Sequence, residues 1–148
     1  METGVVLSLD SEETVGENNS AANAIDGNSS TIWHTRWHTD KKQRHSVTVD
    51  MGAIHRIGGF TDLPRQDGLL NSVVEKYRFE TSTDAVTWTT NIAVGSFANI
   101  QNKPSFQEVS FALVKAPYFR FTSLHAIWGS GWTSAAEISV LPASAASD

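Results

Sequence analysis

The chain has 148 residues, of which 40% are apolar and 18% are charged, and it carries a formal net charge of −5, 5 Trp and no Cys. This length is typical of a single domain whose core is large enough to be stable without covalent cross-links. The acidic balance disfavours nucleic acid and anionic lipid as partners, and no apolar run approaches the roughly 18 residues that cross a bilayer. The lack of Cys excludes disulfides, thiolate metal sites and Cys nucleophiles.

Short strands are the recurring element that the sequence predicts, because apolar and polar residues alternate with period two. In chain order we expect strands in the runs 5–9, 46–51, 77–81, 106–111, 118–122 and 138–141. Turn-forming pairs separate these runs, among them Met51-Gly52, Asp67-Gly68 and Thr83-Asp84, and only the run from Ala21 to Ile25 favours a helical turn. Short strands at spacings of roughly 8–12 residues predict an all-β sandwich or barrel.

The two ends of the chain favour a domain taken from a longer protein. The start, Met1 to Gly4, lacks the basic and apolar regions of a signal peptide. Residues 142–148 have the small, polar composition of a linker. We therefore expect one domain over residues 1–141 and a linker-like tail over residues 142–148, with a small natural protein with frayed ends as the alternative.

Two loop-rich stretches, residues 12–44 and 125–136, hold four of the five Trp. The first stretch places the oxygen-bearing side chains of Asp26, Asn28 and Thr31 close together. Such oxygens suit a hard cation such as calcium. An ordinary turn, in which the Asp26 side chain caps its own backbone, accounts for the same spacing.

The run from Asn23 to Trp37, NAIDGNSSTIWHTRW, resembles the opening of a discoidin-type, coagulation-factor C-type domain, and more narrowly a family 32 carbohydrate-binding module. Residues 46–52, 59–68 and 134–138 agree with the same family in the same order. The resemblance extends from about Val5 to Val140. It implies a jelly-roll β-sandwich, discoidin-like and galactose-binding-domain-like, whose loops carry the binding site at one end.

The resemblance also implies a structural cation, usually calcium, that joins an early loop to the last strand. It assigns the ion to four side chains and two backbone carbonyls, those of Asp26, Asn28, Thr31 and Glu137 and those of Asn23 and Ala136. Two carboxylates balance a divalent charge, and a hard cation prefers such an all-oxygen set. In a chain without disulfides, this ion is expected to stabilise the fold rather than take part in a reaction.

For the loop-bearing end, the resemblance implies a site for galactose or N-acetylgalactosamine. Matching residue by residue gives the sugar-binding set Glu17, His34, Arg65 and Asn71, with Trp37 in the loop after His34. The chemistry suits a sugar, because an Arg makes directional, charge-assisted bonds and a neutral His offers one donor and one acceptor. A Trp ring suits the apolar C–H face that galactose presents opposite its axial hydroxyl.

Each polar member of this set has a structural alternative. His34 can cap its loop, Arg65 can be a solvated charge paired with Asp62 or Asp67, and Asn71 can be a turn residue. Glu17 is the weakest assignment, because other acidic residues lie near it in the sequence.

The remaining Trp residues divide between the core and the site. Trp33 and Trp88 lie beside strand-like segments, so we expect both in the core. Trp128 and Trp132 flank a Gly-rich loop, where an exposed ring is costly. One of these two is expected to be a sugar platform and the other a packing residue, and the sequence does not decide between them.

Three classes of function compete. The first is a non-catalytic, lectin-like module that brings an attached, secreted glycoside hydrolase to galactose-type glycans, with no nucleic acid partner and no insertion into membranes. The second is a discoidin-type adhesion domain that binds another glycan, a protein or a lipid surface, against which the acidic charge and the lack of Cys both count. The third is a glycosidase, which needs two carboxylates facing each other across a cleft. The acidic residues here are scattered over loops, so we expect no catalytic site.

Overall fold

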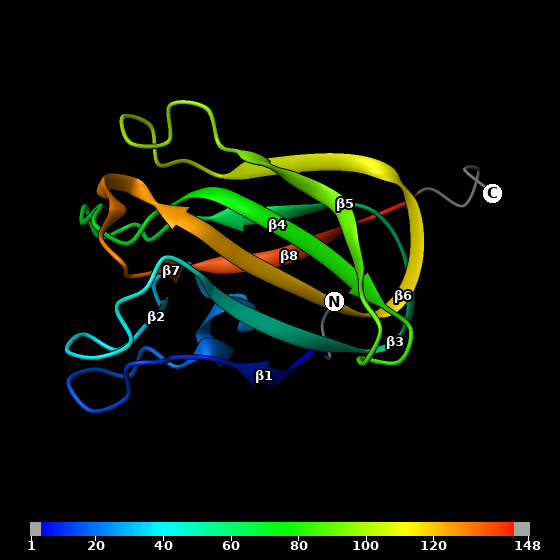
Figure 1. Ribbon diagram of the computed structural model, residues 1–148, viewed down its shortest axis with the longest axis horizontal. Coiled ribbons are helices and arrows are strands. Elements are labelled where there is room, and N and C mark those ends of the chain that lie inside the picture. The colour runs from blue at the N-terminus through cyan, green and yellow to red at the C-terminus, as the bar shows by residue number, and fades with distance from the viewer. Residues whose placement is uncertain (1–3, 144–148) are drawn as a thin grey trace.

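The computed structural model describes residues 4–143, which form an antiparallel β-sandwich (Figure 1). The elements in chain order are β1 (Val5–Leu9), η1 (Ala21–Ile25), β2 (Trp33–His34), β3 (His45–Leu63), β4 (Val74–Ser82), β5 (Thr89–Ser96), β6 (Gln107–Ala126), η2 (Ile127–Gly129), β7 (Ser134–Ala135) and β8 (Glu137–Pro142). The expected all-β class is confirmed, as is the helical turn over Ala21–Ile25. Within the described part, the helices are too short to cross a membrane.

Two long strands, β3 and β6, pair with each other and contribute to both layers of the sandwich (Figure 1). The first half of β3 pairs with β1 and with the second half of β6, which in turn pairs with β4, and β5 follows at the edge. The second half of β3 pairs with β8 and with the first half of β6. A strand that changes layer in this way needs a bend, and the β3–β6 register shifts between Asp50 and His55.

The length of these strands corrects the sequence prediction at two points. Met51-Gly52 was expected to be a turn, but it lies inside β3, where Gly52 has a φ of 82° and accommodates the irregularity without ending the strand. The runs 106–111 and 118–122 were expected as separate strands, but β6 is continuous over both. Pairing along the full length of β3 holds the two halves of β6 in one strand.

Aromatic side chains fill the space between the layers. Phe60 of β3 stacks on Phe79 of β4 with ring centroids 4.8 Å apart and an interplanar angle of 1°, and Phe79 in turn lies 5.2 Å from Phe119 of β6. All three rings are fully buried. Burial of such large apolar groups contributes roughly 1.5–3 kcal/mol per side chain, so this cluster is a main source of stability.

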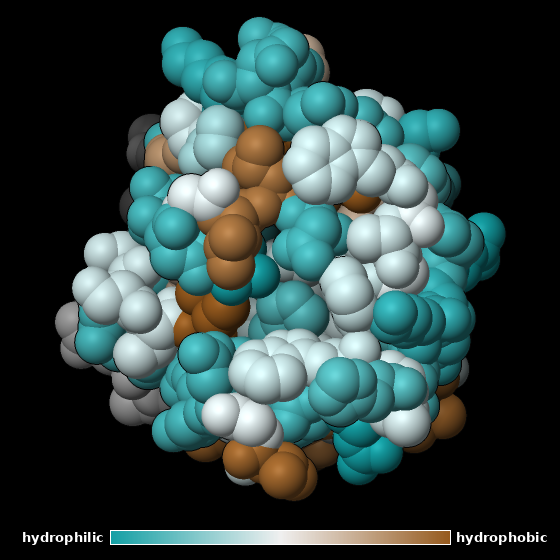
Figure 2. All heavy atoms as spheres, turned by 90° about the vertical axis from the view of Figure 1, so that its left-hand side faces the viewer, coloured by the Kyte–Doolittle hydropathy of each residue, from teal (hydrophilic) through white to brown (hydrophobic). Residues whose placement is uncertain are grey.

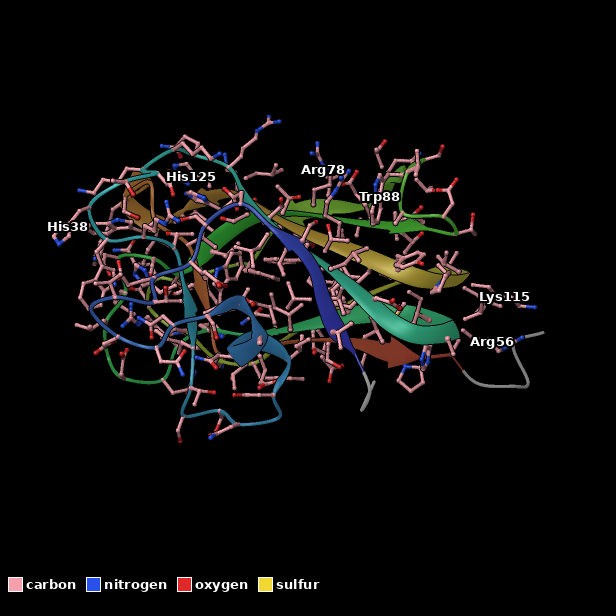
Figure 3. All side chains as sticks on the ribbon, turned by 90° about the horizontal axis from the view of Figure 1, so that it is seen from below. His38, Arg56, Arg78, Trp88, Lys115 and His125 are labelled. Carbon is pink, nitrogen blue, oxygen red and sulfur yellow. The ribbon has the colours of Figure 1, made fainter. Side chains whose placement is uncertain are left out.

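Of the two Trp residues expected in the core, only Trp33 is there. It is fully buried, and its indole N–H donates to the Ser11 carbonyl at 2.9 Å. Trp88 is instead half-buried near Arg78, far from the end of the molecule where His38 lies (Figure 3). Its ring packs under the guanidinium of Arg120, 4.4 Å from the ring centroid. Trp88 precedes β5, an edge strand with a largely exposed face, which is why a strand-like neighbourhood did not place it inside.

The last strand runs beyond the expected domain boundary. Pro142 belongs to β8 and pairs with Ile57, and the Ala143 N–H donates to the Arg56 carbonyl at 2.9 Å. The paired structure therefore includes residues 142 and 143, which the sequence assigned to the tail. The rest of the predicted tail, residues 144–148, lies outside the described residues.

A short two-stranded sheet joins the two loop-rich stretches of the sequence. β2 pairs with β7 through Trp33↔Ala135 and His34↔Ser134. This pairing brings residues about one hundred positions apart in the chain to the same end of the sandwich, on the left in Figure 1. The loops after β2, after β3 and before β7 gather at this end.

Candidate functional site

The loop-bearing end carries a cavity of about 520 Å³, here called the aromatic cavity. Figure 2 looks onto this end, where mostly polar side chains and a short hydrophobic strip surround a hollow. Six of the seven residues expected to bind sugar line the cavity: Glu17, His34, Trp37, Arg65, Asn71 and Trp132. A volume of this size lies within the range of small-ligand sites.

Arg65 lies in the loop after β3 and is held in a fixed orientation. Its Nε and Nη2 donate to the two carboxylate oxygens of Asp67 at 2.8 and 2.7 Å, and its Nη1 donates to the Ser72 hydroxyl at 3.0 Å. The hydrogen bond from Arg65 is the main reason that the pKa of Asp67 is lowered. Arg65 does pair with Asp67, but it is only 7% exposed and is therefore not a solvated surface charge. Among the described residues, one N–H on each Nη remains free for a ligand.

His34, at the end of β2, presents a hydrogen-bond acceptor to the same cavity. It is 4% exposed, and its Nδ1 lies 2.6 Å from the Thr35 carbonyl, so Nδ1 carries the proton and donates. Burial, reinforced by the positive charge of Arg65, lowers the pKa of His34 and keeps the ring neutral. Nε2 then has a free lone pair. The cavity thus offers an acceptor on His34 beside donors on Arg65.

Two indole rings form the apolar part of the cavity wall. Trp132 lies with its ring centroid 6.1 Å from that of His34, and the Lys41 ammonium is 4.3 Å from the Trp132 ring centroid. Trp37 rests on the backbone of Gly16, where an added Cβ would come within 2.3 Å of the Trp37 ring. Gly16 is therefore required by the close approach of Trp37.

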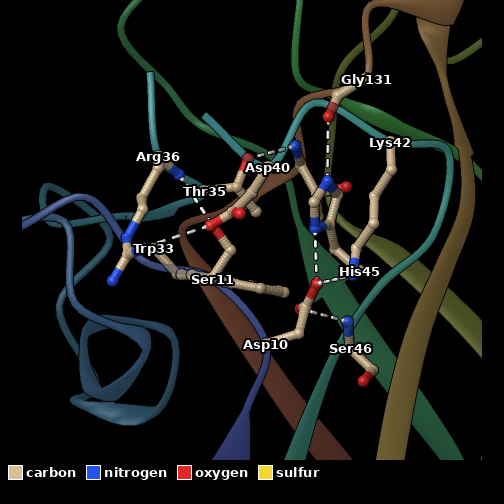
Figure 4. A network of polar contacts seen from close by, with 11 residues as sticks. Asp10, Ser11, Trp33, Thr35, Arg36, Asp40, Lys42, His45, Ser46 and Gly131 are labelled. Atoms are coloured by element: carbon tan, nitrogen blue, oxygen red, sulfur yellow. Dashed lines mark hydrogen bonds and ion pairs between the residues drawn. The ribbon is translucent and has the colours of Figure 1, made fainter. Parts of the chain in front are cut away.

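A buried histidine fixes the loop that carries Trp132 (Figure 4). His45, the first residue of β3, is 1% exposed; its Nε2 lies 2.9 Å from the Gly131 carbonyl and its Nδ1 lies 2.8 Å from Asp10 Oδ2. Both ring nitrogens face acceptors, so both bonds form only when the ring is protonated. Burial opposes this charge, but the bonds with Asp10 and Gly131 outweigh it and raise the pKa of His45. The Lys42 N–H also donates to Gly131 O, at 3.3 Å.

The remaining predicted members supply polar groups at the rim. Glu17 is exposed, and its Oε2 accepts a hydrogen bond of 3.2 Å from the Asn19 amide. Asn71 is half-buried and makes no side-chain hydrogen bond to another described residue, which leaves both its donor and its acceptor for a ligand.

Of the two Trp residues that flank the Gly-rich loop, Trp132 lines the aromatic cavity and Trp128 does not. Trp128 belongs to η2 and is 62% exposed. The φ of Trp128 is 62° and that of Gly129 is 61°, so the chain turns sharply at these two residues. Gly131, whose carbonyl contacts His45, follows two residues after Gly129. Trp128 is therefore not the packing residue that the sequence predicted either.

Five further residues line the cavity that the sequence did not assign to it: Asn19, His38, Lys41, Asp67 and Leu69. The sequence indicated the position of Asp67 only indirectly, as a possible ion-pair partner of Arg65. The other four lie in irregular loops, whose residues carry no periodic pattern from which their direction could be read.

A second polar cluster contains residues expected to hold a cation. Asp26 accepts hydrogen bonds from the Thr31 hydroxyl and from the Asn28 N–H, the latter at 2.9 Å. The Asp26 carboxyl also lies within hydrogen-bonding reach of Glu137 at the start of β8. Burial, followed by the contact with Asp26, raises the pKa of Glu137 to about 8.

The cluster brings together carboxyl and hydroxyl oxygens, the kind of ligand that a hard cation prefers. One carboxylate oxygen, Oε1 of Glu137, is buried and has no hydrogen-bond partner. Two carboxyls that face each other cannot both ionise without a compensating positive charge. The described residues contain no group of three or more His, Cys, Asp or Glu that could hold a metal, so a cation here would rely on these two carboxyls and neutral oxygens. Asn23 and Ala136 flank the cluster in sequence, on η1 and next to Glu137.

Comparison with known proteins places the chain in a family. The model of the F5/8 type C domain matches residues 8–138. A galactose oxidase from Gibberella zeae is 37% identical over 129 residues, and a sialidase from Micromonospora viridifaciens is 34% identical over 137 residues. The alignments cover 85% and 91% of this chain but only 18% and 21% of those proteins.

A solved structure gives the same result at the level of the fold. It is the domain CpGH89CBM32-5 from Clostridium perfringens in complex with GalNAc-β-1,3-galactose, which superposes with a TM-score of 0.82 at 30% sequence identity and covers 93% of this chain and 94% of that one. The matched range contains β2 to β7 in full, together with the last two residues of β1 and the first two of β8. The chain belongs to the F5/8 type C domain family.

Proposed function

We propose that this domain is a non-catalytic carbohydrate-binding module that recognises terminal galactose or N-acetylgalactosamine in the aromatic cavity. The observation that carries the proposal is the placement of the neutral His34 acceptor and the fixed Arg65 donors beside the Trp132 ring. The similar domain from C. perfringens was solved with a disaccharide that contains both sugars, which supports the same ligand class here.

The chemistry of each group suits a galactose-type ring. Nε2 of His34 accepts a hydrogen bond from one hydroxyl, and the free N–H groups of Arg65 donate hydrogen bonds to the oxygens of that hydroxyl and its neighbour. The apolar face of the sugar packs against the Trp132 ring, which contributes area without a large loss of side-chain entropy. Asn71 and Glu17 bind hydroxyls at the rim. No step breaks or forms a covalent bond, and the site retains its ligand unchanged.

We also propose that the domain serves a larger, secreted, glycan-active enzyme, such as a glycoside hydrolase. The chain spans about a fifth of the length of the curated relatives it matches, and both of those relatives are named as enzymes. A single monosaccharide in an open polar site binds weakly, with Kd on the order of 0.1–1 mM. Targeting then depends on tethering to the enzyme or on several modules acting together.

For the second cluster we propose a structural calcium ion held by Asp26, Asn28, Thr31 and Glu137 with help from the carbonyls of Asn23 and Ala136. The support is the buried oxygen of Glu137 that lacks a hydrogen bond, together with its contact with Asp26. When bound, the ion supplies the positive charge that lets both carboxyls ionise, and it links the loop after η1 to β8.

Isothermal titration calorimetry with methyl galactoside tests the sugar assignment. We expect saturable binding in the range of Kd given above and competition by N-acetylgalactosamine. Methyl glucoside, which differs only in the orientation of the 4-hydroxyl, is the matched ligand control and is expected to bind at least about tenfold more weakly, since a lost hydrogen bond and an unpaired buried partner cost about 1.4 kcal/mol or more. A folded protein that binds neither galactoside nor N-acetylgalactosamine contradicts the assignment.

A further inference from the structure

A second cavity adjoins the aromatic cavity. It has a volume of about 510 Å³ and shares three lining residues, Glu17, Asn19 and Asp67, with its neighbour. Its other lining residues are Asn18, Ser29, Ser30, Thr31, Ile32 and Gln66. Because it is almost entirely polar, we call it the polar cavity. The shared residues form a common rim, so one ligand longer than a monosaccharide can reach both cavities.

We propose that the polar cavity is a subsite for the neutral sugar unit that precedes the terminal galactose-type residue of a glycan. This inference rests on the proposed function of the aromatic cavity and names the class of ligand that the complete site takes: a neutral oligosaccharide rather than a monosaccharide.

The polar cavity presents hydrogen-bonding groups that the protein does not use itself. Asn18, Ser29 and Ser30 are exposed, and among the described residues their side chains make no hydrogen bonds. The Gln66 amide nitrogen donates to the Pro64 carbonyl at 2.7 Å, which orients its oxygen as a free acceptor. Hydroxyl and amide groups without partners in the protein suit a hydroxyl-rich ligand.

The aromatic lining of the two cavities determines the order in which a disaccharide binds. No aromatic residue lines the described part of the polar cavity, whereas Trp37 and Trp132 line its neighbour. A terminal galactose needs a ring against its C–H face, so it takes the aromatic cavity and leaves the preceding unit in the polar one.

The charges at its rim exclude acidic sugars from the polar cavity. Its rim carries the carboxylates of Glu17 and Asp67, and among the described residues no Lys or Arg lines it. Arg65 balances Asp67 from the side of the aromatic cavity, but Glu17 has only an amide partner, Asn19. A uronic or sialic acid unit would face this uncompensated negative charge. The subsite therefore fits a hexose or an N-acetylhexosamine.

Calorimetry with a series of galactosides tests the subsite. The probes are methyl galactoside, lactose, N-acetyllactosamine, GalNAc-β-1,3-galactose, and lactobionate, in which a carboxylate replaces the reducing end of lactose. We expect at least one neutral disaccharide to bind about 3- to 10-fold more tightly than methyl galactoside, and lactobionate to show no gain. Equal Kd values for methyl galactoside and all neutral disaccharides overturn the proposal.

A variant that fills the polar cavity makes the test specific. Ser29 lines only the polar cavity, so Ser29→Tyr is expected to remove the disaccharide gain and to leave the Kd of methyl galactoside unchanged within about twofold. Thr83→Tyr adds the same side chain in the exposed turn after β4 and is expected to keep the gain. A gain that survives Ser29→Tyr overturns the subsite alone, whereas a wild-type protein that binds no galactoside overturns the proposed function as well.

Discussion

The aromatic cavity and the Asp26–Glu137 cluster differ in how their charges are balanced. In the cavity, Arg65 is neutralised by Asp67 and braced by Ser72, so the site is complete before any ligand arrives. In the cluster, two carboxyls face each other, and one of them has a buried oxygen without a hydrogen bond. A balanced site suits a neutral ligand such as a sugar, and an unbalanced one suits a cation. The class of ligand can thus be inferred from whether a buried carboxyl is left without a partner.

The largest effect expected on binding is that of Arg65→Ala. It removes the charged donors of the aromatic cavity, which contribute about 3 kcal/mol, so galactoside affinity should fall more than about 100-fold in calorimetry. Thermal stability should change little by comparison, because Asp67 is 48% exposed and water can replace its partner. A variant that retains wild-type affinity would remove Arg65 from the site.

The cluster is expected to respond to calcium, not to sugar. Removal of calcium by a chelator should lower stability by about 3 kcal/mol when the ion was present at roughly 100 times its Kd, which is a fall of several degrees in Tm. Galactoside affinity of the aromatic cavity should remain within about twofold. Differential scanning calorimetry and sugar titration on the same chelated sample measure both effects.

Glu137→Gln separates the two sites further, because its effect on stability should be of opposite sign with and without calcium. Without the ion, the folded wild type holds Glu137 protonated at neutral pH, since its folded pKa of about 8 lies above its unfolded value, and this costs stability as pH rises above about 4.5. Gln removes that cost, so the chelated variant should be more stable than the chelated wild type by about 1 kcal/mol. In calcium the variant should be the less stable of the two. The same order in both conditions contradicts the cation assignment.

Trp132→Ala and Trp128→Ala form a matched pair for the aromatic wall. Trp132 lines the cavity and Trp128 does not, so only the first change should weaken galactoside binding, by about 1–2 kcal/mol or roughly 5- to 30-fold. The change in Trp fluorescence on sugar binding should shrink with Trp132→Ala, which leaves only Trp37 in the cavity wall, and should be kept by Trp128→Ala. Weaker binding by Trp128→Ala and unchanged binding by Trp132→Ala would show that Trp128 of η2 is the residue that packs against the sugar.

Two histidines should give opposite dependences on pH, each of about 1 kcal/mol. The pKa of His34 is lowered by burial, so its contribution to stability and its free Nε2 acceptor are present above about pH 6.5 and are lost as pH falls through the folded pKa. The pKa of His45 is raised despite burial, so its contribution is full below about pH 6.5 and is lost as pH rises through its folded pKa.

Melting curves of the wild type, His34→Gln and His45→Gln from pH 5 to 9 separate these contributions. Loss of His34 should flatten the acidic side of the stability curve, and loss of His45 should flatten the alkaline side. Identical slopes in all three proteins would show that neither ring titrates between the folded and unfolded states.

The fold could be predicted from the sequence further than the site could. Period-two alternation and turn residues placed most strands, because each strand has a buried and an exposed face. They could not show that β3 continues through Gly52, since a positive φ serves a bend inside a strand as well as a turn between strands. Trp88 was misplaced for a related reason, because alternation does not distinguish an edge strand such as β5 from an internal one.

The family motifs identified most of the residues that line the aromatic cavity, and four of them, His34, Trp37, Arg65 and Trp132, lie in or within three residues of β2, β3 or β7. Lys41 and Leu69 were missed because their direction depends on the path of irregular loops. The sequence could not decide between Trp128 and Trp132, because the loop that carries them is held by contacts such as that between His45 and the Gly131 carbonyl, 86 positions apart, which no local pattern contains.

The central claim is that a neutral galactose-type sugar binds in the aromatic cavity. It is tested most directly by a calorimetric titration of methyl galactoside into the wild type and into Arg65→Ala under identical conditions. We expect a Kd on the order of 0.1–1 mM for the wild type and no measurable binding by a variant that retains its melting transition. Equal heats in the two proteins, or none in either, would contradict the claim.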